Sequence, residues 1–427
     1  MPAISSLKEN LFNGSFDAQL KSVYVTDEAI KQQYQRYSDV AESFIELFGK
    51  DREVSLLSAP GRTEICGNHT DHNFGKVLAG AVNLDAIAVA SKNDSGIIRV
   101  KSAGYDMDEI DISDLEVHKE QYGKSVSLLR GICADFKKLG YNIGGFDATT
   151  ESSVMSGSGL SSSAAYEVLI CTILNHLYND GKIDDVTIAK ISQFAENEYF
   201  GKPCGLLDQM ASSVGSMVTI DFEAPEKPLI EKIDLDFSKF SHALCIVDTG
   251  GNHSDLTDDY AAVRQEMESV AEFFGKKVLR QVDEKEFYKA IPEIRQKLGD
   301  RAVLRAIHFY NENHRVDDEI SAIKKGDFEE FKRIVIESGE SSFKYNQNIY
   351  SNKFVAQQPI ALALNISEKI LKGKGAYRVH GGGFAGTIQA FVPFEKLDEY
   401  KAEMERIFGK GKCYVLSIRP VGGAKIV

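Results

Sequence analysis

Residues 152–178 read SSVMSGSGLSSSAAYEVLICTILNHLY. Two glycines, Gly157 and Gly159, permit close backbone approach, and the hydroxyl run 161–163 supplies candidates for a helix N-cap. After this run, apolar side chains recur at helical spacing, at Ala165, Val168, Leu169, Ile173 and Leu177. The stretch therefore predicts a Gly/Ser-rich loop that runs directly into a helix with one buried face.

Such a loop is a candidate anion site. Free backbone N–H groups at a helix N-terminus attract negative charge, and the helix dipole adds to the attraction. The pattern is equally compatible with an ordinary capped helix behind a flexible turn. The sequence has no Gly-x-x-x-x-Gly-Lys-Ser/Thr motif, and Gly157-Ser158-Gly159 lacks the third glycine of the dinucleotide fingerprint. A phosphate site here would be of another kind.

The composition is that of an ordinary globular protein. At 427 residues, with 43% hydrophobic and 26% charged residues, the chain is long enough for two or three domains. Its formal net charge of −13 argues against a nucleic-acid partner or an anionic membrane surface. The N-terminus lacks an apolar leader, and no apolar run is long enough to span a bilayer. We therefore expect a cytoplasmic protein.

The six cysteines are scattered, without Cys-x-x-Cys pairing. This spacing favours reduced, mostly buried thiols over a zinc site or a disulfide framework.

The order of expected elements indicates an α+β architecture without regular βαβ repetition. A turn at 58–61 should close the strand at 54–57, and residues 77–90 fit a buried strand pair or one strand leading into another. A Pro- and charge-rich stretch at 221–239 suggests a division into domains 1–225 and 226–427. Further strands are expected at 97–101, 108–112, 146–150, 243–247 and 387–392, and helices at 30–48, 125–139, 186–199 and through much of 256–371.

Residues 61–73, GRTEICGNHTDHN, form the densest polar cluster. A fixed positive charge, mixed hydrogen-bonding side chains and glycines suit a ligand with many hydroxyl groups. A metal site built from His69, Asp71 and His72 is an alternative, although no further Cys or His lies at zinc spacing. A polar turn with capping side chains is another.

Three further features are ambiguous when each is taken alone. Asp208, in the segment CGLLDQ at 204–209, could be a general base or a helix cap. Glu196 lies on the expected helix 186–199 and could be an ordinary surface residue. The glycine-rich segment 380–386 could be a simple turn or a wall close to a ligand.

Together, these segments resemble the GHMP small-molecule kinases and, within them, the galactokinase family. The resemblance rests on the order of four motifs: the Arg/His/Asp cluster, GSGLSSSA at 157–164, GKPCGLLDQ at 201–209 and GGGFAG at 381–386. It extends from about residue 10 to the C-terminus and implies a two-domain α+β fold with the active site in the interdomain cleft. The implied reaction is ATP-dependent phosphorylation of galactose at the C1 hydroxyl, giving galactose 1-phosphate and ADP.

The resemblance also implies roles for individual residues. Asp208 would act as base on the C1 hydroxyl, and Arg62 would stabilise charge on the transferred phosphoryl group. Mg²⁺ would be held by Ser162 and Glu196. The ATP phosphates would contact Gly157, Ser158, Gly159, Leu160, Ser161, Ser162 and Ser163, and the sugar would contact Asn68, His69, Asp71, Gly205, Asp208 and Tyr260.

Three residue patterns depart from the family. Asn68 stands where galactokinases usually have Glu, which weakens the contact expected on the O6 side of the sugar. Residues 124–129 lack the usual Trp and Tyr pair, so adenine must be held differently. Ala385 replaces a glycine.

Asn68 motivates one alternative, a kinase for another sugar, such as N-acetylgalactosamine or a pentose. A sensor that binds sugar and ATP without turnover is an alternative of a different class. The expected partners are galactose and ATP, and a monomer is compatible with the sequence.

Overall fold

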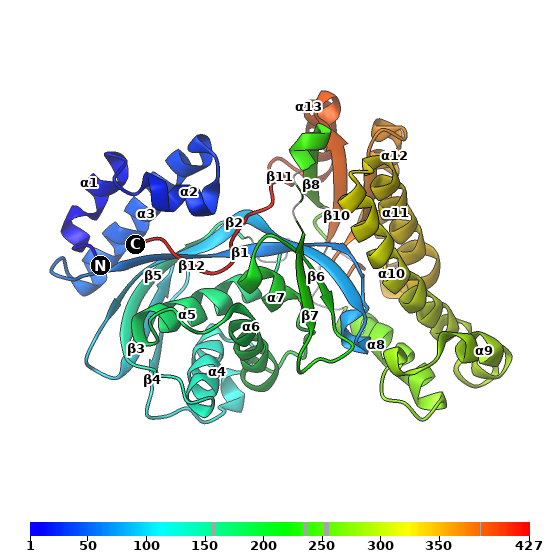
Figure 1. Ribbon diagram of the computed structural model, residues 1–427, viewed down its shortest axis with the longest axis horizontal. Coiled ribbons are helices and arrows are strands. Elements are labelled where there is room, and N and C mark those ends of the chain that lie inside the picture. The colour runs from blue at the N-terminus through cyan, green and yellow to red at the C-terminus, as the bar shows by residue number, and fades with distance from the viewer. Residues whose placement is uncertain (155–158, 234, 236, 252–255, 385) are drawn as a thin grey trace.

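The structure is a computed structural model of the 427-residue chain and describes all of it except residues 155–158, 234, 236, 252–255 and 385. Two β-sheets, each with helices on both faces, form the fold (Figure 1). Neighbouring strands in the described chain are antiparallel except for one parallel pair, β3 and β5. The predicted α+β class is confirmed.

The larger sheet has eight strands. The main order is β12-β1-β2-β5-β3-β4, and β6 pairs with both β2 and β7. The long strand β2 pairs with β6 near its start and with β5 near its end. The strands are β1 (Ser55–Cys66), β2 (Lys76–Lys92), β3 (Ile97–Ser102), β4 (Met107–Asp111), β5 (Phe146–Ser152), β6 (Met217–Asp221), β7 (Leu229–Ile233) and β12 (Ala424–Lys425).

Alternating residues of β1 and β2 divide between two cores, because successive side chains of a strand point to opposite faces. Leu56 and Val89 pack with the N-terminal helices, whereas Leu57 and Ala88 belong to the core on the other face. The first group of helices is α1 (Leu7–Phe12), α2 (Asp17–Tyr24) and α3 (Asp27–Phe48). The second is α4 (Ser125–Lys138), α5 (Ser162–Tyr178), α6 (Asp185–Phe194), the π-helix η4 (Ala195–Phe200) and α7 (Leu207–Val214).

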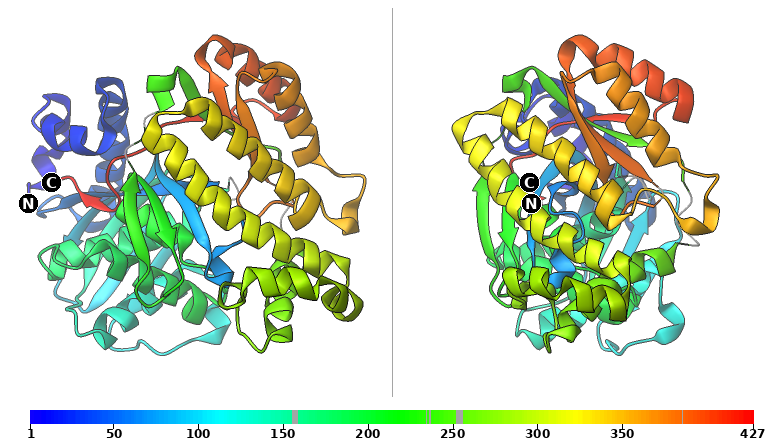
Figure 2. Two further views of the ribbon diagram at one scale, coloured as in Figure 1. Left: turned by 45° about the vertical axis from the view of Figure 1, so that its right-hand side comes forward. Right: turned by 90° about the vertical axis from the view of Figure 1, so that its right-hand side faces the viewer.

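The smaller sheet has the order β11-β8-β10-β9 and lies beside the long helices of the C-terminal half (Figure 2). Its strands are β8 (His242–Asp248), β9 (Ala376–His380), β10 (Thr387–Pro393) and β11 (Cys413–Leu416). The helices of this half are α8 (Thr257–Phe273), α9 (Glu284–Leu298), α10 (Asp300–Lys325), α11 (Phe328–Ser341), α12 (Pro359–Leu371) and α13 (Leu397–Phe408). Short helical turns lie at Ile4–Ser6, Asp71–Asn73 (η2), Lys119–Gln121, Phe237–Phe240, Leu279–Gln281, Ser342–Asn346 (η7), Asn352–Phe354 and Phe394–Lys396.

The prediction that a turn at 58–61 ends the first strand is wrong. Strand β1 continues to Cys66, because an irregularity between Pro60 and Arg62 accommodates the proline without ending the ladder. Gly61 is needed here for close packing: a Cβ at this position would lie 2.8 Å from the carbonyl oxygen of Leu160. Strand β1 therefore carries Arg62 directly past the loop that leads into α5.

Two other elements differ from expectation. Residues 77–90 lie in the single strand β2, and the expected helix 186–199 is divided between α6 and η4. The helix expected at 30–48 ends at Phe48 as predicted, and α5 follows the predicted loop. Strands β6, β7, β9, β11 and β12 and helix α13 were not anticipated.

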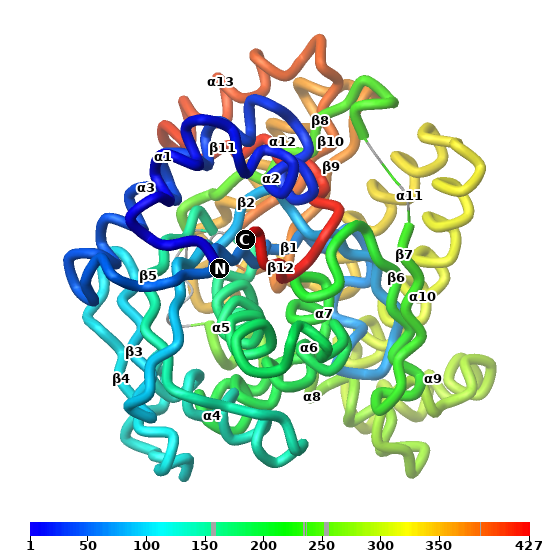
Figure 3. Tube along the Cα trace, turned by 60° about the vertical axis from the view of Figure 1, so that its left-hand side comes forward, coloured from blue at the N-terminus to red at the C-terminus, as the bar shows by residue number. Residues whose placement is uncertain are grey.

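The two chain termini lie side by side, because β12 returns to pair with β1 (Figure 3). The division into domains 1–225 and 226–427 stays a prediction; strand β7, at 229–233, pairs with β6 in the larger sheet. In the described part of the chain, no helix is both long and apolar enough to span a membrane.

Asp85 of β2 joins the N-terminal helices and the C-terminal tail to the larger sheet. Its fully buried carboxylate accepts hydrogen bonds from Arg36 at 2.7 Å, Arg419 at 3.2 Å and the Tyr24 hydroxyl at 2.7 Å. Burial raises the pKa of Asp85, but Arg36 and Arg419 outweigh it, so the pKa lies below its ordinary value. The carboxylate is therefore ionised at neutral pH.

Asp85→Asn should lower the midpoint of urea unfolding at pH 7. The substitution leaves two arginines without their shared countercharge, a loss on the order of 3–5 kcal/mol for a buried pair. Because the folded-state pKa is depressed, the contribution is present above the unfolded pKa of about 3.9 and is lost as the pH falls through the folded value. The exposed Asp94→Asn is the control. Equal midpoints for both variants at pH 7 would contradict this role.

Candidate active site

Arg62 connects three of the motifs found in the sequence. It is 8% exposed and donates from Nε and Nη2 to the two carboxylate oxygens of Asp208, at 2.7 and 2.8 Å. Its Nη1 donates to the carbonyl oxygen of Gly159 at 2.5 Å. Such bidentate ion pairs are strong and fix the relative orientation of the two side chains. The strand β1, the loop before α5 and the start of α7 therefore meet at one guanidinium group.

Asp208 lies in the first turn of α7 and is 35% exposed at its side chain. Burial raises its pKa, but Arg62, with help from the Ser161 hydroxyl, outweighs this effect and brings the pKa below its ordinary value. Asp208 is therefore an ionised carboxylate at neutral pH. It can accept a hydrogen bond from a ligand hydroxyl, but its low basicity makes it a weak proton acceptor.

Ser161 does not cap α5 with its side chain, in contrast to the expectation for the hydroxyl run. It occupies the N-cap position in a left-handed conformation, with φ of 56°, and its hydroxyl donates to Asp208 instead. Gly159 and the buried Leu160 precede it, and Ser162 begins the helix. Gly157 and Ser158 lie outside the described residues.

Asp71 and Gly205 come from different motifs and lie against each other. Asp71 begins η2, and a Cβ on Gly205 would be only 1.7 Å from Asp71 Oδ2. The pKa of Asp71 is raised to about 6 by burial, and secondarily by the negative charges of Asp208 and Glu64. Position 205 must therefore be glycine, because a side chain there would collide with the carboxylate of Asp71.

His69 and Tyr260 both contact the glycine-rich turn at 381–384. The Nε2 atom of His69 lies 2.9 Å from the carbonyl oxygen of Gly382, and the hydroxyl of Tyr260 on α8 donates to that of Gly383 at 2.8 Å. Burial lowers the pKa of His69 to about 4. His69 is thus neutral at pH 7, and because its partner is a carbonyl, Nε2 carries the proton.

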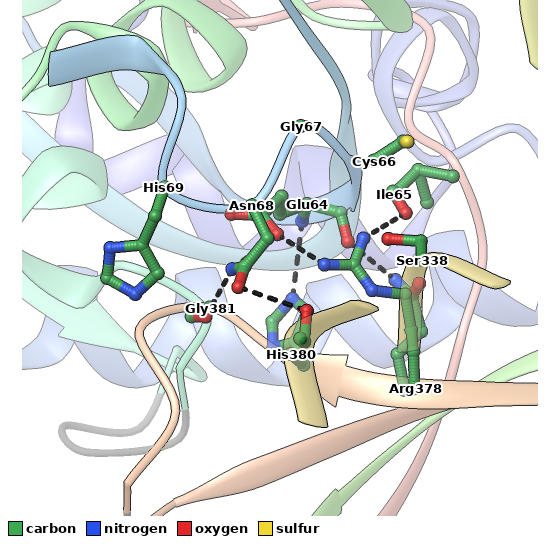
Figure 4. Close-up of polar contacts among 12 residues, drawn as sticks. Glu64, Ile65, Cys66, Gly67, Asn68, His69, Ser338, Arg378, His380 and Gly381 are labelled. Carbon is green, nitrogen blue, oxygen red and sulfur yellow. Dashed lines mark hydrogen bonds and ion pairs between the residues drawn. The ribbon is translucent and has the colours of Figure 1, made fainter. Parts of the chain in front are cut away.

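Asn68 is 1% exposed, and its amide makes its hydrogen bonds within the protein (Figure 4). Its Nδ2 donates to Glu64 Oε1 at 3.0 Å and to the carbonyl oxygen of Gly381 at 2.7 Å. Its Oδ1 accepts from Asn348 Nδ2 at 2.9 Å. Position 68 therefore joins strand β1 to the 381–384 turn and to the segment that follows η7.

Glu64 and Arg378 form a buried ion pair between the two sheets, which sequence reasoning missed. Arg378 of β9 donates to Glu64 Oε1 at 2.9 Å and to the carbonyl oxygen of Ile65 (Figure 4). Glu64 lies two residues beyond Arg62 on the same face of β1, so a longer predicted strand would have revealed it. Nothing in the sequence marks Arg378 as its partner.

Glu196 lies on the π-helix η4, 2% exposed, within reach of the start of α5. Its Oε1 is 3.3 Å from the Ser163 hydroxyl and 3.0 Å from Lys202 Nζ, and its Oε2 accepts from Gln209 at 2.7 Å. The sequence had marked Ser162, the preceding residue, as its companion. Carboxylate and hydroxyl oxygens are the donors that a hard divalent cation prefers.

A second carboxylate, that of Glu167 on α5, is linked to Glu196 through the side chain of Gln209. Gln209 Nε2 donates to Glu167 Oε2 at 3.1 Å as well as to Glu196. The other oxygen of Glu167, Oε1, is buried without a hydrogen-bond partner among the described residues. The pKa of Glu167 is raised well above its ordinary value by burial and by the charge of Glu196.

The predicted alternative of a zinc-type site at His69, Asp71 and His72 has no support in the described residues. No group of three or more His, Cys, Asp or Glu side chains there is arranged to hold a metal ion. An ion at Glu196 would accordingly take other ligands from phosphate and water, as Mg²⁺ commonly does.

Comparisons with known proteins match the segments that carry these residues. The family model for the N-terminal domain of GHMP kinases matches residues 127–216, and the galactokinase galactose-binding signature matches residues 42–92. These segments contain β1, the turn after it, α5 and α7.

Known galactokinases are similar over most of the chain. A galactokinase from Glaesserella parasuis serovar 5 is 32% identical, over 83% of this chain and 89% of its own. One from Streptomyces coelicolor is 29% identical, over 86% and 92%. The crystal structure of Lactococcus lactis galactokinase complexed with galactose covers 91% of this chain and all of its own, with a TM-score of 0.79 at 21% identity, which confirms the GHMP kinase fold. The chain belongs to the galactokinase family.

Proposed function

We propose that this protein transfers the γ-phosphoryl group of ATP to the C1 hydroxyl of galactose, giving galactose 1-phosphate and ADP. Family membership supports the reaction class, and one observation carries the assignment to this site. The Arg62–Asp208 ion pair contacts Gly159 and Ser161 in the loop that leads into α5, and the charge of Asp208 acts on Asp71 in the turn after β1. A positive charge for the phosphoryl group and an anion for the sugar hydroxyl are thus already adjacent.

In this proposal Asp208 orients the C1 hydroxyl and accepts a hydrogen bond from it. Its low pKa fits an orienting role better than early proton removal, and a loose transition state for phosphoryl transfer needs little help from a base. Arg62 then stabilises charge on the equatorial phosphoryl oxygens. Catalysis rests mainly on positioning and on neutralising charge.

The sugar hydroxyls are assigned to Asp71, His69, Tyr260 and the backbone at Gly205. These groups present a carboxylate, an imidazole, a phenol and backbone atoms to a ligand with many hydroxyl groups. Asn68, whose amide is engaged by Glu64 and Gly381, acts by holding the wall of the site in place. Because Asn68 stands where galactokinases usually have a glutamate, the contact expected on the O6 side of the sugar is weaker, and this favours one alternative, a kinase for another sugar.

The ATP phosphates are assigned to residues 157–163, and Mg²⁺ to Ser162 and Glu196. The oxygen donors and the unpartnered Glu167 Oε1 beside them fit a hard cation. Bound there with ATP, the ion would supply positive charge to the nucleotide phosphates. Because the chain has six unpaired cysteines and requires ATP, we expect it to work in the cytoplasm.

ADP release measured over a panel of sugars tests the substrate. We expect galactose to be turned over, and Asp208→Asn to lower kcat by about 10²-fold or more, because the variant loses both the ionised partner of the hydroxyl and the charge that orients Arg62. ADP release with N-acetylgalactosamine or a pentose, but not with galactose, would show that the named substrate is wrong. Binding of galactose and ATP without ADP from any sugar would favour the sensor.

Asn68→Glu tests the role of position 68. The new carboxylate would lie near Glu64 Oε1, which is 3.0 Å from Asn68 Nδ2, so we expect a lower melting temperature from an unpaired buried charge on the order of 3 kcal/mol. Adding Glu64→Gln should recover much of the loss. In the double variant, the KM for galactose relative to 6-deoxygalactose reports on contact with O6. A single variant as stable as the wild type would rule out the packing described here.

A further inference from the structure

Lys202 lies in the linker between η4 and α7 and contacts the proposed metal ligand from the solvent side. Its Nζ is 3.0 Å from Glu196 Oε1, and its side chain is 63% exposed, whereas that of Glu196 is 3% exposed. Gln209 occupies the other oxygen of Glu196. Lys202 is therefore the positive charge that compensates this buried carboxylate in the free protein.

The same oxygen, Oε1, is the one directed toward the start of α5. Ser163, in the first turn of α5, also contacts Glu196 Oε1, at 3.3 Å. A divalent cation that bound Glu196 from this side would lie close to the ammonium group of Lys202. Two cations at one carboxylate oxygen repel each other, so metal binding must displace Lys202.

We propose that Lys202 is a positioning residue that holds Glu196 in the free enzyme and moves to the phosphate oxygens of the nucleotide when the cation arrives. The inference rests on the proposed roles of Glu196 and of residues 157–163. The lysine has a flexible four-carbon side chain that is largely exposed to solvent. The N-terminus of α5 is within its reach, because Ser163 and Lys202 contact the same oxygen of Glu196. The exchange keeps the charge of the site nearly balanced in both states.

The electrostatics agree with a permanently charged lysine. A lysine side chain has an ordinary pKa of about 10.4, far above neutral pH, and that of Lys202 is largely exposed to solvent. The ammonium group thus stays charged after it leaves Glu196 and requires another anion. A nucleotide phosphate bound beside Ser163 supplies one.

Lys202→Met tests both proposed contacts of the lysine, the one with Glu196 and the one with the nucleotide phosphates, because it keeps the length of the side chain and removes the charge. Binding of Mn²⁺ alone, followed by electron paramagnetic resonance, should tighten about fivefold or more, since the ion no longer competes with the lysine. Binding of the Mg²⁺ complex of a non-hydrolysable ATP analogue, measured by calorimetry without sugar, should weaken about fivefold or more. A purely structural lysine would not tighten Mn²⁺ binding.

Two variants serve as controls. Lys202→Arg keeps the charge and should restore nucleotide affinity, whereas Lys182→Met removes an exposed lysine that also follows a glycine and pairs with Asp180 at 3.1 Å, and should change neither affinity. The proposed role of Lys202 would be overturned if the Lys202→Met variant bound Mn²⁺ and the nucleotide complex as tightly as the wild type does. It would also be overturned if the variant bound both more weakly. Failure of the wild type to bind the nucleotide would instead overturn the proposed kinase function, and this inference with it.

Discussion

Arg62 and Asp208 are 146 residues apart in the sequence and meet through two hydrogen bonds of 2.7 and 2.8 Å. The rest of the site depends on this ion pair. Strand β1 must run past Pro60 to carry Arg62 to the loop before α5, and Gly61 must lack a side chain for the two backbones to approach. Asp208 remains ionised because Arg62 offsets the cost of its burial.

A second set of buried polar contacts joins the two sheets around the same point. Glu64 on β1 pairs with Arg378 on β9, and Asn68 joins β1 to the 381–384 turn. Buried charges of this kind are retained only when they are paired and hydrogen-bonded. The walls of the site are therefore held by the same interactions that hold the two sheets together, and a change at position 64 or 68 affects both stability and the ligand site.

Much of the site was predictable, because its members lie in short motifs with strong chemical character. The sequence alone predicts that the glycine- and serine-rich loop, the His69–Asp71 turn and Asp208 belong to one site, and the structure brings residues of these segments close together. The local sequence pattern was a less reliable guide to the path of the backbone. Pro60-Gly61 is typical of a turn, but an irregularity in the sheet lets β1 continue, a choice made by the pairing with β2.

The residue types and their order along the chain already indicate an α+β kinase with a Gly/Ser-rich loop before a helix and a polar turn after a strand, because these properties depend on local spacing. The partner of each side chain was specified only by folding. Ser161 bonds to Asp208 and not to its own helix, Asn68 bonds to Glu64 and Gly381, and Glu196 faces Lys202. Such contacts depend on which strands and loops come together in space, and hydrogen bonds and ion pairs act only over a few ångströms.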